Sequence, residues 1–274
     1  INHSMASIST GGFSTSDLSL ANWSQPAVHW VAVLTMIFGS LPFTLYVATL
    51  RGNRRALFKD HQVRGFLGFL LVTWLVFGTW LWLHSDNSWL DAFRIVAVNV
   101  TSVVTTTGFA LGDYTTWGSF AVLLFFYLTF VGGCSGSTAG GLKIFRFQVA
   151  YVLLKANLQQ LIHPRAVIKQ QYNNHNLDEE IVRSLITFSF FFAITIGVIA
   201  LGLALIGLDW VTALTGAATA VCNVGPGLGP IIGPAGNFST LPDYAKWLLT
   251  VGMLLGRLEI LTVLVLVTRA FWRH

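Results

Sequence analysis

Three short segments of the chain share a run of small residues that ends in an aligned glycine. They read SISTGGFS at 7–14, VVTTTGFA at 103–110 and AVCNVGPG at 220–227. The aligned glycines lie 96 and 117 residues apart, so the pattern recurs at a long spacing. The aligned residues are Thr10, Gly11 and Gly12, then Thr106, Thr107 and Gly108, and finally Asn223, Val224 and Gly225.

This pattern suits the binding of a cation by backbone carbonyl groups. Extended backbone presents carbonyl oxygens that replace the hydration shell of an ion. Glycine allows the torsions that turn these carbonyls to one side. A short helix before each segment would direct its negative C-terminal end toward the same point. We therefore predict cation ligands in the nine aligned residues. The alternative is that the glycines only allow close packing of helices, as in GxxxG motifs.

A second run of small residues, GGCSGSTAGG at 132–141, follows the apolar stretch 119–131. Five of its ten residues are glycine, and each glycine costs a helix about 1 kcal/mol relative to alanine. We expect the helix to stop there and the chain to continue as a loop within the membrane. Neither a Walker A phosphate loop nor a nucleophile elbow fits this run. The alternative is a passive packing kink.

Arg257 is a charged residue inside another apolar stretch, 247–267. A charge at this depth costs about 2.5–3.5 kcal/mol on insertion scales, so we expect the guanidinium to face the protein interior or a wet cavity. Glu259 would point to a different side of the same helix. A fixed positive charge near a cation path favours a role as a gate or barrier, in contact with the loop at 132–141. The alternative is a structural salt bridge.

The composition indicates a membrane protein. Hydrophobic residues make up 54% of the 274 residues and charged residues only 10%, against roughly 25% in soluble domains. This excludes an ordinary soluble enzyme, a disordered protein and a nucleic-acid binder. Two isolated cysteines indicate neither a disulfide framework nor a metal site. Runs long enough to cross a bilayer of about 30 Å lie at 25–50, with a kink at Pro42, and at 65–83, 184–208 and 247–267.

Basic residues fix the orientation of these runs. Thirteen of the sixteen Lys and Arg residues fall in three clusters, which the positive-inside rule places in the cytoplasm. The stretches 86–118 and 209–243 must then leave from and return to the outer face. Each is too apolar for a free loop and too polar for a lipid-facing helix. We expect each to form a re-entrant loop, in which a short helix is followed by extended backbone that lines a path.

The same residues resemble a known family. TSVVTTTGFALGDY at 101–114, FVGGCSGSTAGGLKIFR at 130–146 and TAVCNVGPGLG at 219–229 are similar to the membrane subunit of bacterial Trk potassium-uptake systems, in the Trk/Ktr/HKT superfamily. The resemblance covers essentially the whole chain. It implies potassium as the bound ion, no organic cofactor, and a multi-pass protein of the bacterial inner membrane.

The resemblance also implies an architecture and partners. We expect an all-α membrane protein with helix–pore loop–helix units around a pseudo-fourfold ion path. The units would be 1–50, which ends the second unit, then 65–155 and 181–270, and the first unit would lie outside this chain. The family implies a homodimer in membrane lipid, with a cytosolic nucleotide-binding regulatory subunit of TrkA type and no nucleic acid. The gate would lie under the filter and include Gly132, Gly133, Gly136, Ser137, Gly140, Gly141 and Arg257.

The sequence therefore predicts potassium uptake through a gated, carbonyl-lined filter. The pattern leaves ion symport and passive flux both open. One alternative is a secondary active, cation-coupled transporter of another solute, because broken helices also build such sites. A membrane enzyme is a second alternative, although the sequence has no paired histidines, carboxylate dyad or nucleophile–base arrangement to support it.

Overall fold

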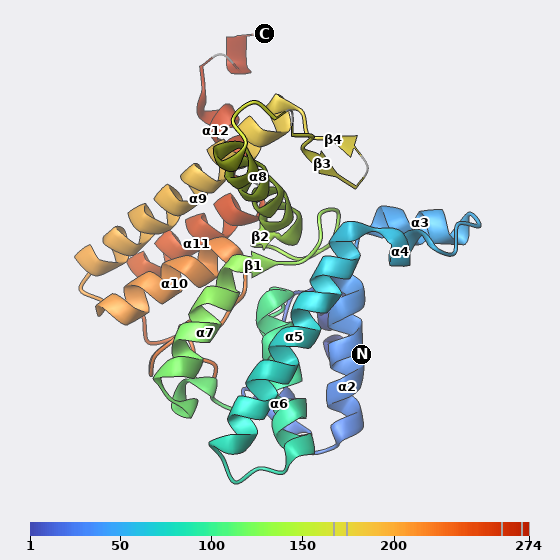
Figure 1. Cartoon of the computed structure of the whole chain (residues 1–274). Coiled ribbons are helices and arrows are strands. Elements are labelled where there is room, and N and C mark those ends of the chain that lie inside the picture. Colours follow the sequence, from blue (N-terminus) through green and yellow to red (C-terminus); the bar gives the residue numbers. More distant parts are fainter. Residues whose placement is uncertain (167, 174, 259, 270, 274) are drawn as a thin grey trace.

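The computed structural model describes residues 1–166, 168–173, 175–258, 260–269 and 271–273, and this part of the chain is mainly helical (Figure 1). Its α-helices are α1 Asn2–Ile8, α2 Pro26–Gly39, α3 Phe43–Leu50, α4 Ala56–Lys59, α5 His61–Leu83, α6 Trp89–Val104, α7 Ser119–Phe130, α8 Ile144–Ile162, α9 Glu179–Leu205, α10 Trp210–Cys222, α11 Asp243–Arg257 and α12 Ile260–Val267. The strands are β1 Val131–Gly132, β2 Leu142–Lys143, β3 Gln171–Tyr172 and β4 His175–Asn176.

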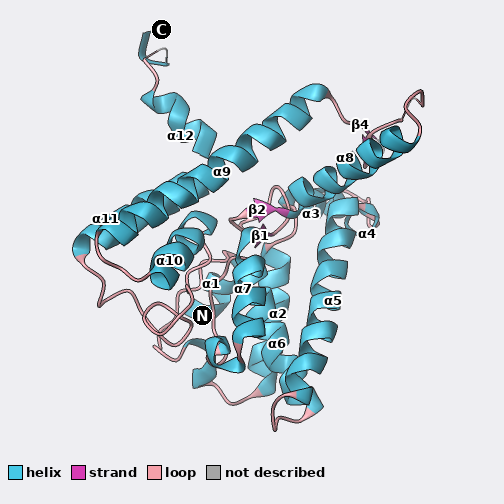
Figure 2. Cartoon of the chain, turned by 60° about the vertical axis from the view of Figure 1, so that its left-hand side comes forward, coloured by secondary structure: helices cyan, strands magenta, loops and turns pink. Residues whose placement is uncertain are grey.

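Two helical groups make up most of the molecule. In the first, α6 packs against both α5 and α2, and α1 packs against α2. In the second, α10 packs against α9 and α11, which themselves lie side by side (Figure 2). Helix α7 contacts both α6 and α10 and so joins the groups. In each group a short helix, α6 or α10, follows a long apolar helix, as the sequence predicts for 86–118 and 209–243.

Two described helices, α5 and α9, are long and apolar enough to cross a membrane. The bent pair α2 and α3 would raise this number to three if it forms a single span. These helices correspond to three of the predicted runs, at 65–83, 184–208 and 25–50.

The predicted kink at Pro42 is found, and it is a break that divides the run 25–50 into two helices. Helices α2 and α3 are bent by 89° at the break between them, and α3 turns away from the bundle (Figure 1). Pro42 has no N–H to continue the helix, and it disfavours helical torsions in the residue before it. The loop at 132–141 holds this break, because the Ser40 carbonyl accepts from the Cys134 N–H at 3.0 Å and the Gly136 carbonyl accepts from the Phe43 N–H at 3.0 Å.

The prediction of one helix over 247–267 is wrong. Helix α11 ends at Arg257 and α12 begins at Ile260, while Glu259 lies outside the described residues. Arg257 therefore stands in the last turn of a helix, where a cation interacts favourably with the negative C-terminal end. The charge therefore lies at a helix end and not in the middle of an apolar helix, where it would be costly.

Carboxylate and hydroxyl side chains fix where three of the helices begin. Asp60 accepts from the N–H groups of Gln62 and Val63 at the start of α5. Ser88 accepts from the Asp91 N–H at the start of α6, and Asp209 accepts from the Thr212 N–H at the start of α10. These N-caps satisfy donors that the first helical turn leaves unpaired.

The cap of α10 yields a stability prediction. We expect Asp209→Ala to lower the free energy of unfolding by about 1 kcal/mol, whereas Asp209→Asn keeps most of the cap. Hydrogen bonds from Thr212 hold the pKa of Asp209 below its ordinary value of 3.8. The ionised cap therefore stabilises the fold above that ordinary value, and its contribution is lost as the pH falls through the lowered pKa.

Thermal unfolding of the wild type and both variants in detergent, between pH 7 and pH 3, measures this effect. Asn has no carboxylate to protonate, so the acid loss of stability assigned to this cap should be absent in Asp209→Asn. Equal melting temperatures for Asp209→Ala and the wild type at pH 7 would contradict the role of the cap.

Candidate functional site

The three aligned segments follow the ends of three short helices in the same way. Helices α1, α6 and α10 end just before Thr10, Thr106 and Asn223. These three residues have φ values of 49°, 56° and 57°, all in the left-handed region. The glycine two positions later again has a positive φ, of 67° at Gly12, 85° at Gly108 and 116° at Gly225. The backbone thus repeats as the sequence does.

Each of these helix ends is closed by the same pair of backbone hydrogen bonds. The left-handed residue donates to the carbonyl three positions before it, and the next residue donates to the carbonyl five positions before it. The second of these bonds joins Gly11 to Ala6 at 2.8 Å, Thr107 to Ser102 at 2.8 Å, and Val224 to Thr219 at 3.0 Å. This is the Schellman pattern of helix termination. It leaves the chain free to continue as non-helical backbone through Gly12, Gly108 and Gly225.

Two of the left-handed residues are an unfavourable choice for that conformation. Thr10 and Thr106 are β-branched, and a positive φ is uncommon for such residues. Strain of this kind costs on the order of 1–3 kcal/mol per residue and persists only where the surroundings hold it. Asn223 tolerates the same torsions better. Strained residues of this kind cluster at functional sites, and the aligned sequences alone did not reveal the strain.

The glycines allow the segments to approach one another closely. A side-chain carbon on Gly12 would lie 1.8 Å from the Thr107 carbonyl oxygen, and one on Gly108 would lie 2.2 Å from the Val224 carbonyl oxygen. The three segments, which we call the filter segments (10–12, 106–108 and 223–225), therefore lie side by side in chain order. Their glycines lie beyond the helix ends, so packing between helices does not explain them.

Buried polar side chains hold the backbone after the filter segments. The Asn99 amide on α6 donates to the Leu111 carbonyl at 2.9 Å and accepts from the Leu111 N–H at 2.9 Å. After the third filter segment, the Thr215 hydroxyl on α10 accepts a hydrogen bond from the Leu228 N–H at 3.1 Å. Both contacts tie the chain that leaves a filter segment back to the helix that precedes it.

The run at 132–141, which we call the Gly-rich loop, begins where α7 ends. Strands β1 and β2 pair in parallel, with Val131 opposite Leu142, and so close the loop at its base. The loop needs glycine at Gly132, where a side-chain carbon would lie 2.2 Å from the Gly140 carbonyl oxygen. It also rests on α10, because such a carbon on Gly140 would lie 2.6 Å from the Cys222 carbonyl oxygen. Helix α8 then leaves the loop in a new direction (Figure 2).

The ends of several helices converge on this loop. The Gly39 carbonyl, at the end of α2, accepts from the Thr138 N–H at 3.2 Å and from the Thr138 hydroxyl at 3.0 Å. Gly39 also touches the end of α1, since a side-chain carbon there would lie 2.3 Å from the Ile8 carbonyl oxygen. The negative ends of α1, α2 and α10 therefore meet near the loop, which favours positive charge there.

Gln62 is a loop partner that the sequence reading missed. Its side-chain oxygen accepts from the Ser135 N–H, and it lies in the first turn of α5 beside the cap Asp60. The only signal in the sequence is one amide at the cytoplasmic end of an apolar run, which is an ordinary feature of such ends.

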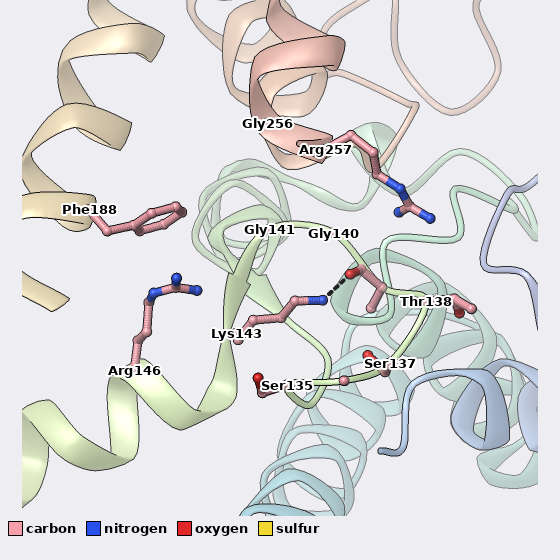
Figure 3. A pocket seen from close by; sticks show the side chains of 12 residues that line it. Ser135, Ser137, Thr138, Gly140, Gly141, Lys143, Arg146, Phe188, Gly256 and Arg257 are labelled. Atoms are coloured by element: carbon pink, nitrogen blue, oxygen red, sulfur yellow. Dashed lines mark hydrogen bonds between the residues drawn. The ribbon is translucent and has the colours of Figure 1, made fainter. Parts of the chain in front are cut away.

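A pocket of about 270 Å³ opens between the Gly-rich loop and the end of α11. Figure 3 shows Arg257 on one side, with Lys143 and Arg146 on the other. Lys143 donates to the Ala139 carbonyl, and the Arg146 guanidinium lies 3.7 Å from the ring centre of Phe188. Three basic residues, Lys143, Arg146 and Arg257, thus line the space beside the loop.

The structure places Arg257 and all the predicted loop residues in one region. Arg257 lines the same pocket as Gly136, Ser137, Gly140 and Gly141. In the described part of the chain, however, no hydrogen bond joins Arg257 to the loop, and the described salt bridges, Arg94–Asp91 and Lys246–Asp243, do not include it. Arg257 thus lies beside the loop, across the pocket.

The filter segments offer carbonyl oxygens and no side-chain metal cluster. Among the described residues, no group of three or more His, Cys, Asp or Glu side chains is placed to hold a metal ion. Backbone carbonyl oxygens of this kind can replace part of the hydration shell of an ion.

The chain is similar to known proteins over nearly its whole length. Residues 1–273 match the sequence profile of the family described as "TrkH: Cation transport protein". The chain is 56% identical over 273 residues to the Trk system potassium uptake protein TrkI of Halomonas elongata, and covers 55% of that protein. It is 33% identical to the Trk system potassium uptake protein TrkH of Escherichia coli K12, of which it covers 56%.

A solved structure agrees over the whole chain. The crystal structure of the potassium transporter TrkH from Vibrio parahaemolyticus superposes with a TM-score of 0.93 at 35% identity, covering 100% of this chain and 58% of that one. The chain thus spans a little over half the length of these relatives.

The Gly-rich loop supplies a prediction about packing. We expect Gly132→Ala to destabilise the protein by about 1–3 kcal/mol, because the added carbon has no room beside the Gly140 carbonyl. Gly68→Ala is the matched control, since nothing lies within 4 Å of the position that its new carbon would take in α5. This control should be neutral or slightly stabilising.

Melting temperatures of the two variants in detergent compare these effects. A Gly132→Ala variant as stable as Gly68→Ala would mean that the loop is not packed as tightly as the structure has it.

Proposed function

We propose that this chain, which belongs to the TrkH family of cation transport proteins, forms most of a potassium path across the bacterial inner membrane. The family is one of transport and not of catalysis, so the membrane-enzyme alternative is wrong. The observation that carries the proposal is the shared geometry of the filter segments. Three helix ends, three left-handed residues and three glycines occur in the same order and lie next to one another.

Potassium is the ion that the relatives' names specify, and the filter segments have the chemistry to take it. Carbonyl oxygens would replace the water around the ion as it enters, and the C-terminal ends of α1, α6 and α10 would favour its positive charge. No protein group changes its charge in this process. Each filter segment has a single aligned glycine. The preference for potassium over other ions would therefore depend on the backbone of these three short segments.

The proposed path includes a further segment of the same kind beside Gly225. Gly12 and Gly108 each face a carbonyl of the next segment, whereas the nearest atom to a side-chain carbon on Gly225 would be the Gly108 Cα, at 3.7 Å. A fourth segment of the same kind at this place would complete a ring with pseudo-fourfold symmetry. This proposal continues the observed order of packing by one step.

The Gly-rich loop and Arg257 form the proposed gate. The loop lies against the ends of the pore helices, and Arg257 faces it across the pocket (Figure 3). A positive charge in a region of low dielectric opposes a passing cation more strongly than it would in water.

We also propose the assembly that the family implies. The chain would form a homodimer in the lipid bilayer and bind a cytosolic nucleotide-binding subunit of TrkA type. The relatives are named as parts of a Trk system, which supports a multi-component assembly. Potassium would flow down its gradient through the filter without a coupled solute. We propose this in preference to a secondary active transporter of another solute.

The first functional prediction concerns the filter. Gly108→Ser should reduce the preference for potassium over sodium, because the new side chain meets the Val224 carbonyl and strains a residue with a φ of 85°. Gly112→Ser is the matched control, since its φ is 81° and nothing lies within 4 Å of the added carbon. Uptake of rubidium and sodium into liposomes that contain the full-length protein measures the preference. An unchanged preference in Gly108→Ser would count strongly against this filter.

The second functional prediction concerns the gate. Arg257→Ala should raise the potassium flux measured when the wild-type gate is closed. The flux through Arg257→Lys should stay near that of the wild type because lysine keeps the charge. Deletion of part of 135–139 should also raise flux. Rubidium efflux from the same liposomes measures both. If Arg257→Ala and the deletion both keep wild-type flux, the gate lies elsewhere.

A further inference from the structure

The side chains of the three left-handed residues all reach the elements that surround the pocket. Thr106 Oγ1 accepts a hydrogen bond from the Gly140 N–H at 2.6 Å. The Thr10 hydroxyl has two acceptors within reach, the Ser9 carbonyl at 2.8 Å and Thr138 Oγ1 at 3.1 Å. The Asn223 amide donates to the Met253 carbonyl on α11 at 3.1 Å. Two filter segments are thus tied to the Gly-rich loop, and the third is tied to the helix that ends in Arg257.

The chemistry of each side chain matches its partner. Gly140 offers an N–H and needs an acceptor, which the Thr106 hydroxyl supplies. Met253 offers a carbonyl and needs a donor, which the Asn223 amide supplies, whereas a carboxylate there could not donate. Thr106 and Gly140 are both buried, so neither group has water as a ready replacement partner.

The strain at these positions gains an explanation from these contacts. Glycine or asparagine would adopt the left-handed torsions of Thr10 and Thr106 more easily than threonine does. Glycine has no hydroxyl to offer the loop. Threonine accepts the strain and directs its hydroxyl toward Gly140 or Thr138, so the strained backbone and the loop contact come as one feature of the same residue.

Helix α11 is seated against the third filter segment just as closely. A side-chain carbon on Gly256 would lie 1.8 Å from the Val221 carbonyl oxygen and 3.0 Å from the Asn223 side-chain nitrogen. The position of Arg257, the next residue, is therefore set by contacts with the end of α10. A shift of that helix end would move the guanidinium as well.

We propose that Thr10, Thr106 and Asn223 are positioning residues that couple the filter to the gate. The two threonines hold the Gly-rich loop against the filter, and Asn223 holds the α11 end that carries Arg257. This inference rests on the proposed function of the loop as a gate. It adds that opening the loop breaks hydrogen bonds to the filter residues themselves, so the filter and the gate change state together.

Thr106→Val tests the proposal, because valine has nearly the shape of threonine and lacks the acceptor. Thr106→Ser restores the hydroxyl. Each change is made in the full-length protein that also carries Ala139→Cys, since Ala139 is buried in the loop and a thiol there reports its displacement. Both cysteines of this chain are buried, but Cys134 lies in the same loop, so alanine replaces it in every protein compared. A membrane-impermeant maleimide, added to the cytoplasmic side, gives the modification rate of the introduced thiol, and rubidium efflux gives the flux.

We expect Thr106→Val to raise both the modification rate of the introduced thiol and the flux by up to about tenfold, as the loss of one hydrogen bond allows. Thr106→Ser should stay near the wild type. The control is Thr219→Val, which removes the hydroxyl that accepts from the Gly225 N–H at 3.0 Å within the third filter segment. It should change the ion preference and leave the modification rate unchanged.

A modification rate in Thr106→Val equal to that of the protein carrying Ala139→Cys alone overturns the coupling. A raised rate without raised flux supports the tie between the loop and Thr106 and instead contradicts the loop as the gate. If Thr106→Val does not fold, Thr10→Val and Thr10→Ser make the corresponding comparison at the other threonine that contacts the loop, and equal modification rates in that pair overturn the coupling.

Discussion

The close approach of backbone to backbone at the filter segments is the constraint on which the rest of the structure depends. The carbonyl of Thr107 fills the space where Gly12 would carry a side chain, and the carbonyl of Val224 does the same at Gly108. Any other residue would push the segments apart. The helices that precede them must therefore end at the same level, and their caps, lengths and left-handed ends all serve that placement.

The Gly-rich loop also depends on close approach of backbone to backbone, in its case with the ends of helices. It lies against the ends of α1, α2 and α10, where a longer side chain at Gly140 would strike the Cys222 carbonyl. Because the loop donates hydrogen bonds to the Gly39 carbonyl and to the Thr106 hydroxyl, its position depends on the filter as much as on its own sequence. A short glycine-rich segment is thus held in one place by its partners and can be released by losing few of them.

Features that depend on local composition were predictable from the sequence. The short helices and the interruption at 132–141 follow from the composition of the segments themselves, and the aligned glycines follow from comparing three such segments. Features that depend on distant partners were not. The sequence predicted a kink at Pro42, but the 89° angle depends on contacts with the loop at 134–136. The loop contact of Gln62 likewise joins residues 73 positions apart. The break after Arg257 was missed because apolar composition alone favours a continuous helix there.

Potassium transport by this chain requires that a cation binds among the carbonyls of the filter segments. Anomalous diffraction from crystals of the full-length protein grown with thallium or rubidium measures this most directly. We predict density within ligand distance of the carbonyl groups of residues 10–12, 106–108 and 223–225, and its loss when sodium replaces the heavier ion. Ordered ion density elsewhere in the transporter, with none between these segments, would contradict the account.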